Sequence, residues 1–174
     1  LKQAVSEFPA VVLTGPRQSG KTTLLKHLFI ERHRYVSLEP PDVRAAAIED
    51  PRSFLVTNPP PVIFDEIQYA PDLLPFIKEL IDEDRHRAGQ YLLTGSQNLL
   101  LMEKVTESLA GRAAMLTLFQ NFLRAIAARS AQLLNLSDVS RDLGVTVNTA
   151  KAWLSVLEAT FQIIVLRPYY ANMG

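Results

Sequence analysis

Two short segments carry residue types suited to binding phosphate and a divalent metal. In the first, two glycines bracket a turn, and a lysine and two threonines follow the second glycine. Glycines let successive backbone N–H groups turn around an anion, and the positive end of a following helix attracts the same anion. We predict that Lys21 binds the outer phosphates of a nucleotide, Thr22 binds Mg²⁺, and Thr23 lies near the α-phosphate. The predicted phosphate-binding residues are Gly15, Pro16, Arg17, Gln18, Ser19, Gly20, Lys21, Thr22 and Thr23.

The second segment is an acidic pair, Asp65 and Glu66, directly after the apolar run 62–64. A buried strand delivers the residues that follow it to one edge of a sheet, where ligands bind. Asp65 is suited to holding Mg²⁺ there, and Glu66 to deprotonating an attacking water. The alternative is an ordinary acidic pair on the surface, which the upstream glycine loop disfavours.

Two further residues are candidates for contacting the outermost phosphate. Ser96 follows the apolar run 91–94, and Asn98 is a weaker candidate nearby. Ser96 equally suits the N-cap of the next helix. Arg112 follows a helix-ending glycine, and its planar guanidinium suits a transferring phosphoryl group in its own subunit or a neighbour's. Its alternative role is to interact with the helix dipole.

The segments that must position these residues alternate between strand-like and helix-like patterns. Apolar runs predict strands at 10–14, 35–38, 62–64, 91–94 and 113–119, and helical spacing predicts helices at 21–31, 42–48, 72–85 and 97–109. Such alternation predicts an α/β fold with a parallel sheet of about five strands and helices on both faces. We place this domain at residues 1–120.

Residues 121–174 are mainly helix-like and form a second predicted module. Helices are expected at 122–130, 138–143 and 148–159, with a β wing at 161–166. A winged-helix module used for packing or partner contact is favoured over one that binds DNA. The exposed face of its last helix offers little beyond Asn148, Thr149 and Lys151, whereas Trp153, Leu154 and Leu157 suit a core.

Composition narrows the class of protein. The 174 residues include 18 basic and 18 acidic side chains, 48% are hydrophobic, and none is cysteine. A zero net charge disfavours a chain that coats nucleic acid, and the lack of cysteine removes disulfides and thiol chemistry. With no apolar run near 20 residues and no basic-then-apolar leader, we expect a cytoplasmic protein without membrane contact.

Taken together, the sequence resembles the prokaryotic AAA-type (AAA+) P-loop ATPases of the archaeal-ATPase-like clade that carry a C-terminal domain of unknown function. The segments that carry the resemblance are 13–23, 36–39, 50–51, 54–55, 63–68, 93–96, 109–112, 143–145, 148–149, 153–154, 157–158 and 168–170. Relative to that family, a stretch near Gln120 and a region after Gly174 are absent, so the second module is expected to be incomplete. The resemblance also makes self-association plausible, with Arg112 acting in trans.

These observations lead to one expected function and two alternatives. We expect an ATPase of low activity in isolation, with ATP and Mg²⁺ bound by the Walker A loop (15–23) and the Walker B acid Asp65. Lys21, Glu66, Ser96 and Arg112 are the expected catalytic set. One alternative is an ATP-gated switch or DNA-binding regulator with incidental hydrolysis, and another is a phosphotransferase acting on a hydroxyl. Glu66 disfavours the latter because a hydroxyl acceptor does not need it.

Overall fold

A parallel β-sheet forms the centre of the molecule in the computed structural model, which describes residues 1–15, 20–96, 99–159 and 162–166. Its five strands lie in the order β2-β3-β4-β1-β5, and every pairing is parallel. The strands are β1 (Ala10–Gly15), β2 (Arg34–Ser37), β3 (Val62–Asp65), β4 (Tyr91–Ser96) and β5 (Ala113–Thr117). The predicted α/β architecture is therefore confirmed.

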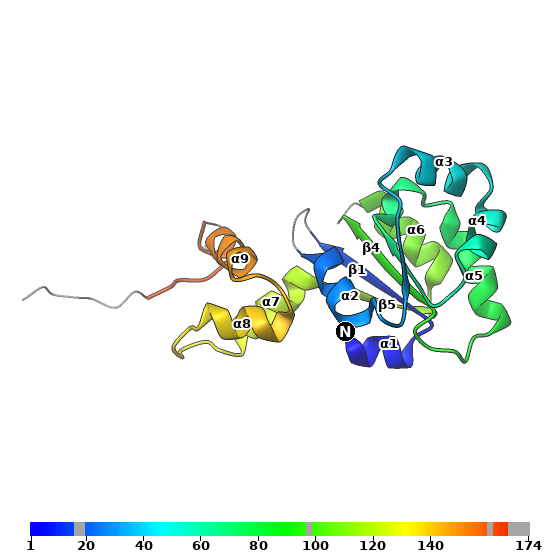
Figure 1. Cartoon of the computed structure of the whole chain (residues 1–174). Helices are drawn as coiled ribbons and strands as arrows, with labels where there is room; N and C mark the ends of the chain where they lie inside the picture. Colours follow the sequence, from blue (N-terminus) through cyan, green and yellow to red (C-terminus); the bar gives the residue numbers. More distant parts are fainter. Residues whose placement is uncertain (16–19, 97–98, 160–161, 167–174) are drawn as a thin grey trace, which may run out of the picture.

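Helices cover both faces of the sheet (Figure 1). Alternate residues of β1 face opposite ways, so Val12 packs in one hydrophobic cluster and Val11 in the other. The cluster around Val12 is covered by α3 (Pro41–Glu49), α4 (Pro51–Thr57), α5 (Leu73–Glu83) and α6 (Leu99–Leu109). The other face packs against α1 (Lys2–Glu7), α2 (Lys21–Phe29) and the C-terminal helices.

The register brings the carboxyl ends of four neighbouring strands close to one another at the same edge of the sheet. Gly15 at the end of β1 pairs with Ser96 at the end of β4, and Ser37 of β2 pairs with Asp65 of β3. Because all strands run the same way, the residues that end or follow them share one edge of the sheet. The amino ends form the opposite edge.

Two helices were not predicted, and both depend on features that sequence patterns suggest only weakly. Helix α4 begins at Pro51, beyond the predicted helix 42–48, because proline is tolerated in the first helical position and Asp50 accepts a hydrogen bond from the Ser53 N–H at 3.1 Å. Helix α1 has only six residues. Helix α3 begins at Pro41, one residue before the predicted start, so Asp42 lies within its first turn.

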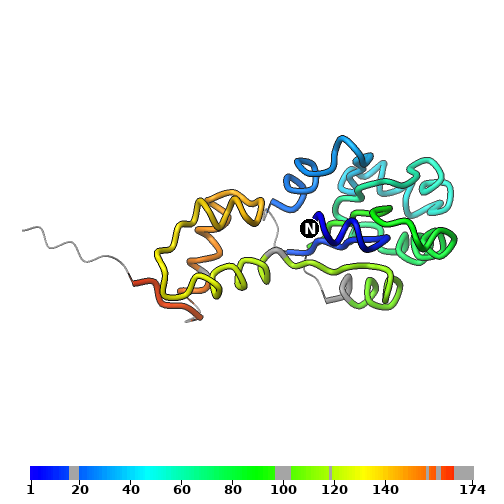
Figure 2. Tube along the Cα trace, turned by 90° about the horizontal axis from the view of Figure 1, so that it is seen from below, coloured from blue at the N-terminus to red at the C-terminus, as the bar shows by residue number. Residues whose placement is uncertain are grey.

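The chain after β5 forms three helices on the side of α2, away from α3–α6 (Figures 1 and 2). They are α7 (Leu118–Ala127), α8 (Leu136–Leu143) and α9 (Val147–Ala159). Helix α7 begins directly after β5, so residues 118 and 119 do not extend that strand as predicted. The proposed division at residue 120 falls within α7 and stays a prediction.

The predicted β wing is not present in the part of it that the structure describes. Residues 162–166 form no strand, and Ile164 and Leu166 are 86% and 89% exposed. Residue 161 lies outside the described residues. Among the described helices, none combines the length and apolar character that crossing a bilayer requires.

Candidate functional site

The start of α2 presents the phosphate-binding candidates at the carboxyl edge of the sheet. Gly20 precedes the helix with φ +82°, and a Cβ added there would meet no atom of the described residues within 4 Å. The Lys21 side chain is buried, and its Nζ donates to the Gly15 carbonyl oxygen at 3.0 Å. Burial lowers the pKa of Lys21, and the Glu66 and Asp65 carboxylates oppose that shift. The described residues therefore leave open space next to Gly20, and the lysine Nζ stays close to the carboxyl end of β1.

Asp65 is the centre of the hydrogen bonding at this edge. Its carboxylate accepts from the Thr22 hydroxyl, with Oγ1 at 2.8 Å from Oδ1 and 3.1 Å from Oδ2. It also accepts from the Thr94 hydroxyl, and from the Tyr35 hydroxyl at 2.7 Å. The side chains therefore come from α2, β4 and β2, so three elements converge on one buried carboxylate.

Glu66 is connected to Ser96 through a residue to which we had assigned no role. The Gln68 amide Nε2 donates to the Glu66 carboxylate, and its Oε1 accepts from the Ser96 backbone N–H at 3.2 Å. The Glu66 backbone N–H donates to the Thr94 hydroxyl at 3.0 Å, and Glu66 itself adopts φ +61°. A non-glycine residue in this left-handed conformation is uncommon and often marks a functional turn.

The donor set at this edge fits Mg²⁺. Thr22 and Asp65 supply a hydroxyl and a carboxylate, and Mg²⁺ prefers such hard oxygen ligands, with phosphates and waters completing its shell. Within the described residues, no group of three or more His, Asp or Glu side chains could hold a metal by itself. Thr22 and Asp65 would hold the ion, which would supply charge neutralisation at the phosphates.

Arg112 does not lie at this edge. It precedes β5, its carbonyl accepts from the Ala10 N–H at the start of β1, and it therefore lies at the amino edge. Its guanidinium donates to both carboxylate oxygens of Asp82, at 2.7 and 2.9 Å, and this contact lowers the pKa of Asp82. The prediction that Arg112 acts on a phosphate of its own chain is wrong, because the strand direction places it across the sheet. A role toward a neighbouring subunit stays a prediction.

The structure thus brings together Gly15, Gly20, Lys21, Thr22, Asp65, Glu66 and Ser96. Thr23 is exposed in the first turn of α2. Four predicted phosphate-binding residues and one weaker candidate lie outside the described residues: Pro16, Arg17, Gln18, Ser19 and Asn98.

Sequence reasoning missed three residues of the site: Tyr35, Thr94 and Gln68. Thr94 and Gln68 had a usable signal, because they lie at or just beyond the carboxyl end of a predicted strand, whereas Tyr35 is the first residue of the predicted strand 35–38 and had no such signal. Which of them would reach Asp65 or Glu66 depended on the strand order, which the sequence pattern did not specify.

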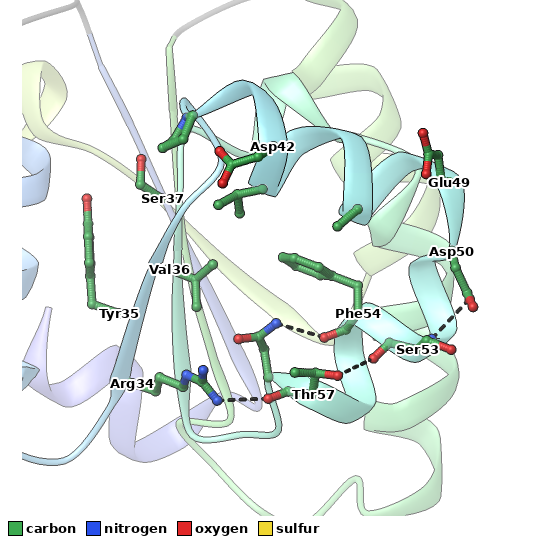
Figure 3. Close-up of a pocket in the computed structure, with 14 residues that line it drawn as sticks. Arg34, Tyr35, Val36, Ser37, Asp42, Glu49, Asp50, Ser53, Phe54 and Thr57 are labelled. Carbon is green, nitrogen blue, oxygen red and sulfur yellow. Dashed lines mark hydrogen bonds between the residues drawn. The ribbon is translucent and has the colours of Figure 1, made fainter.

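A cavity of about 810 Å³ lies next to the site, between β2 and helices α3 and α4. Figure 3 shows Val36 and Phe54 facing each other across it, whereas Tyr35 projects from the other side of β2. The alternation along β2 therefore separates the cavity from the hydroxyl that reaches Asp65.

In the C-terminal helices, the predicted core residues are buried. Trp153, Leu154 and Leu157 all have exposed fractions of 9% or less, whereas Asn148 and Lys151 are exposed. Gly144 ends α8 with φ +67°, and a Cβ there would lie 2.3 Å from the Leu24 Cδ1 of α2. The helix that carries Lys21 and Thr22 is therefore packed directly against the turn between α8 and α9.

Comparisons with known proteins agree with this geometry. A family model described as an AAA domain matches residues 7–125, and one described as a domain of unknown function matches residues 82–174. Uncharacterized proteins of Mycobacterium tuberculosis and Mycobacterium bovis are each 33% identical over 134 residues, which is 77% of this chain. That part is 30% of each relative, so the chain spans under a third of their length.

Proposed function

Because this chain belongs to the family of AAA domains, and by residues 82–174 to a family of unknown function, we propose that it binds ATP with Mg²⁺ and hydrolyses the ATP. An AAA domain suggests nucleotide binding. The Mg²⁺ ion, the hydrolysis of ATP and the residues that carry it out are what we propose in addition. The whole protein's activity and partners are part of the proposal as well.

The observation that carries the proposal is the contact between Thr22 and Asp65. The two residues are 43 positions apart in sequence, yet the hydroxyl and carboxylate meet at 2.8 Å beside the open space at Gly20. A phosphoryl-transfer site needs these two metal ligands next to the anion loop. Lys21 then neutralises phosphate charge, and Asp65 orients the ion's water shell.

Glu66 is the proposed general base. It directly follows Asp65, and its carboxylate now accepts from Gln68. A carboxylate at this position can orient a water molecule and take its proton once its hydrogen bond to the Gln68 amide is broken. Ser96, whose backbone N–H contacts the same amide, is proposed to contact the γ-phosphate.

The test is Glu66→Gln, which keeps the shape of the side chain and removes its basicity. We expect ATP affinity within about threefold of the wild type and a fall in turnover of roughly 100-fold or more, since general bases contribute 10²–10⁴-fold. Binding is measured with a fluorescent ATP analogue, and turnover as free phosphate released.

Glu39→Gln is the matched control, because Glu39 is an exposed acid just beyond neighbouring β2 that makes no side-chain contact with the other described site residues. This control should hydrolyse ATP at the wild-type rate. Normal hydrolysis by Glu66→Gln would show that the assignment is wrong. A phosphorylated acceptor in place of free phosphate would favour the phosphotransferase instead.

The C-terminal helices are proposed to act as a module that responds to nucleotide; they fit the helical part of the expected winged-helix module, whereas the described residues 162–166 form no wing strand. The contact of Gly144 with Leu24 supports this idea, because α2 also carries the phosphate-binding residues. Whether the module then contacts DNA, a protein or a second copy is tested by ATP-dependent binding to duplex DNA over a range of salt concentrations.

A further inference from the structure

We propose that Tyr35 is a positioning residue that holds the Asp65 carboxylate toward the metal; this inference rests on the proposed function. Tyr35 lies on β2, at the edge of the sheet, and its hydroxyl donates to Asp65 Oδ2 at 2.7 Å. Groups that hydrogen-bond to a metal ligand fix its orientation, although they never touch the metal.

The three hydroxyls on Asp65 are not equivalent. Thr22 is itself a proposed metal ligand, so its oxygen lone pair would be directed to the ion. Thr94 donates to Oδ1 and also accepts from the Glu66 N–H. Tyr35 is thus the donor to Oδ2 that does not depend on the metal-binding threonine.

The surroundings of Tyr35 keep its ring in place. The ammonium of Lys26, on α2, lies 3.6 Å from the centre of the ring. A cation over an aromatic face attracts the ring. Helix α2 therefore helps to hold the Tyr35 ring, and the same helix carries the phosphate-binding residues.

The competing explanation is that Tyr35 only satisfies a buried carboxylate and so adds stability. Asp65 is 5% exposed, and an unpaired carboxylate there would be costly. The two roles differ in one measurable quantity. A stabilising role shifts the melting temperature alone, whereas a positioning role changes how much Mg²⁺ is needed to bind nucleotide.

The experiment compares wild type with Tyr35→Phe, using fluorescent N-methylanthraniloyl-ADP as the probe. Affinity is measured in EDTA and across a Mg²⁺ titration. We expect the affinity in EDTA to stay within about twofold, while the Mg²⁺ concentration for half-maximal enhancement rises roughly tenfold. In the Asp65→Asn background, Tyr35→Phe should add no further rise, because its effect passes through the carboxylate.

Tyr91→Phe is the matched control, since it removes the same atom from a tyrosine whose hydroxyl is buried without a hydrogen-bond partner among the described residues. It should leave the Mg²⁺ requirement unchanged. The inference is overturned if Tyr35→Phe needs no more Mg²⁺ than wild type, or if it loses its cooperative melt while the control keeps it. Wild type that binds no probe under any condition would instead contradict the proposed function.

Discussion

The carboxyl edge of the sheet and the helices after β5 are held together by different interactions. At the edge, the hydroxyl groups of Thr22, Tyr35 and Thr94 and the amide of Gln68 converge on the carboxylates of Asp65 and Glu66. In the helices, aromatic rings meet: Trp153 lies 5.8 Å from Phe119 and 5.3 Å from Phe122, measured between ring centres.

This difference separates the residues expected to bind ligand from those expected to stabilise the fold. A network of buried polar groups gives little net stability, because each hydrogen bond replaces one to water. Apolar packing stabilises in proportion to the area removed from water. Substitutions at the edge should therefore change ligand binding more than folding, and substitutions among the rings should do the reverse.

The largest effect is expected for Lys21→Ala. Loss of the buried ammonium should lower nucleotide affinity by roughly two orders of magnitude or more, because a charge partner of the phosphates disappears. The melting temperature should stay the same or rise, since a desolvated cation is removed. Titration with a fluorescent nucleotide and a thermal melt measure both, with exposed Lys2→Ala as the control. Unaltered nucleotide affinity would contradict the assignment of Lys21 to a nucleotide-binding site.

Trp153→Ala should have the opposite profile. Removing a 6%-exposed indole that packs on two phenylalanines should lower the free energy of unfolding by about 3–5 kcal/mol. Urea unfolding measures the loss, and Lys151→Ala on the exposed side of the same helix should change it by less than about 0.5 kcal/mol. A small loss would mean that the rings are not a main source of stability.

The smallest effect is expected at the start of α8. Asn135 Oδ1 accepts from the Ser137 and Asp138 N–H groups at 3.0 and 3.4 Å, so it caps the helix. Asn135→Ala should cost about 1 kcal/mol of unfolding free energy and leave nucleotide affinity unchanged. Gln132→Ala, an exposed change just upstream, is the control. Equal effects of the two would show that the cap contributes nothing.

The comparison also shows where prediction from sequence succeeded. The strands and their carboxyl ends followed from apolar runs, so Asp65 and Ser96 were placed at the correct edge. One of the two roles expected of Arg112, contact with a phosphate of its own chain, could have been excluded from the sequence. A residue that precedes a parallel strand lies at the amino edge, and this rule excludes a contact with a phosphate of the same chain.

By itself, the sequence determined the acidic strand end and the class of fold, because these depend on local spacing and on periodicity along the chain. Only the tertiary structure decided that Tyr35 would reach Asp65, since that contact requires β2 to pair with β3 in one particular register. It also separated two glycines with positive φ. Among the described residues, a Cβ added at Gly20 would meet no atom within 4 Å, whereas one added at Gly144 would lie 2.3 Å from the Leu24 Cδ1, which is distant in sequence.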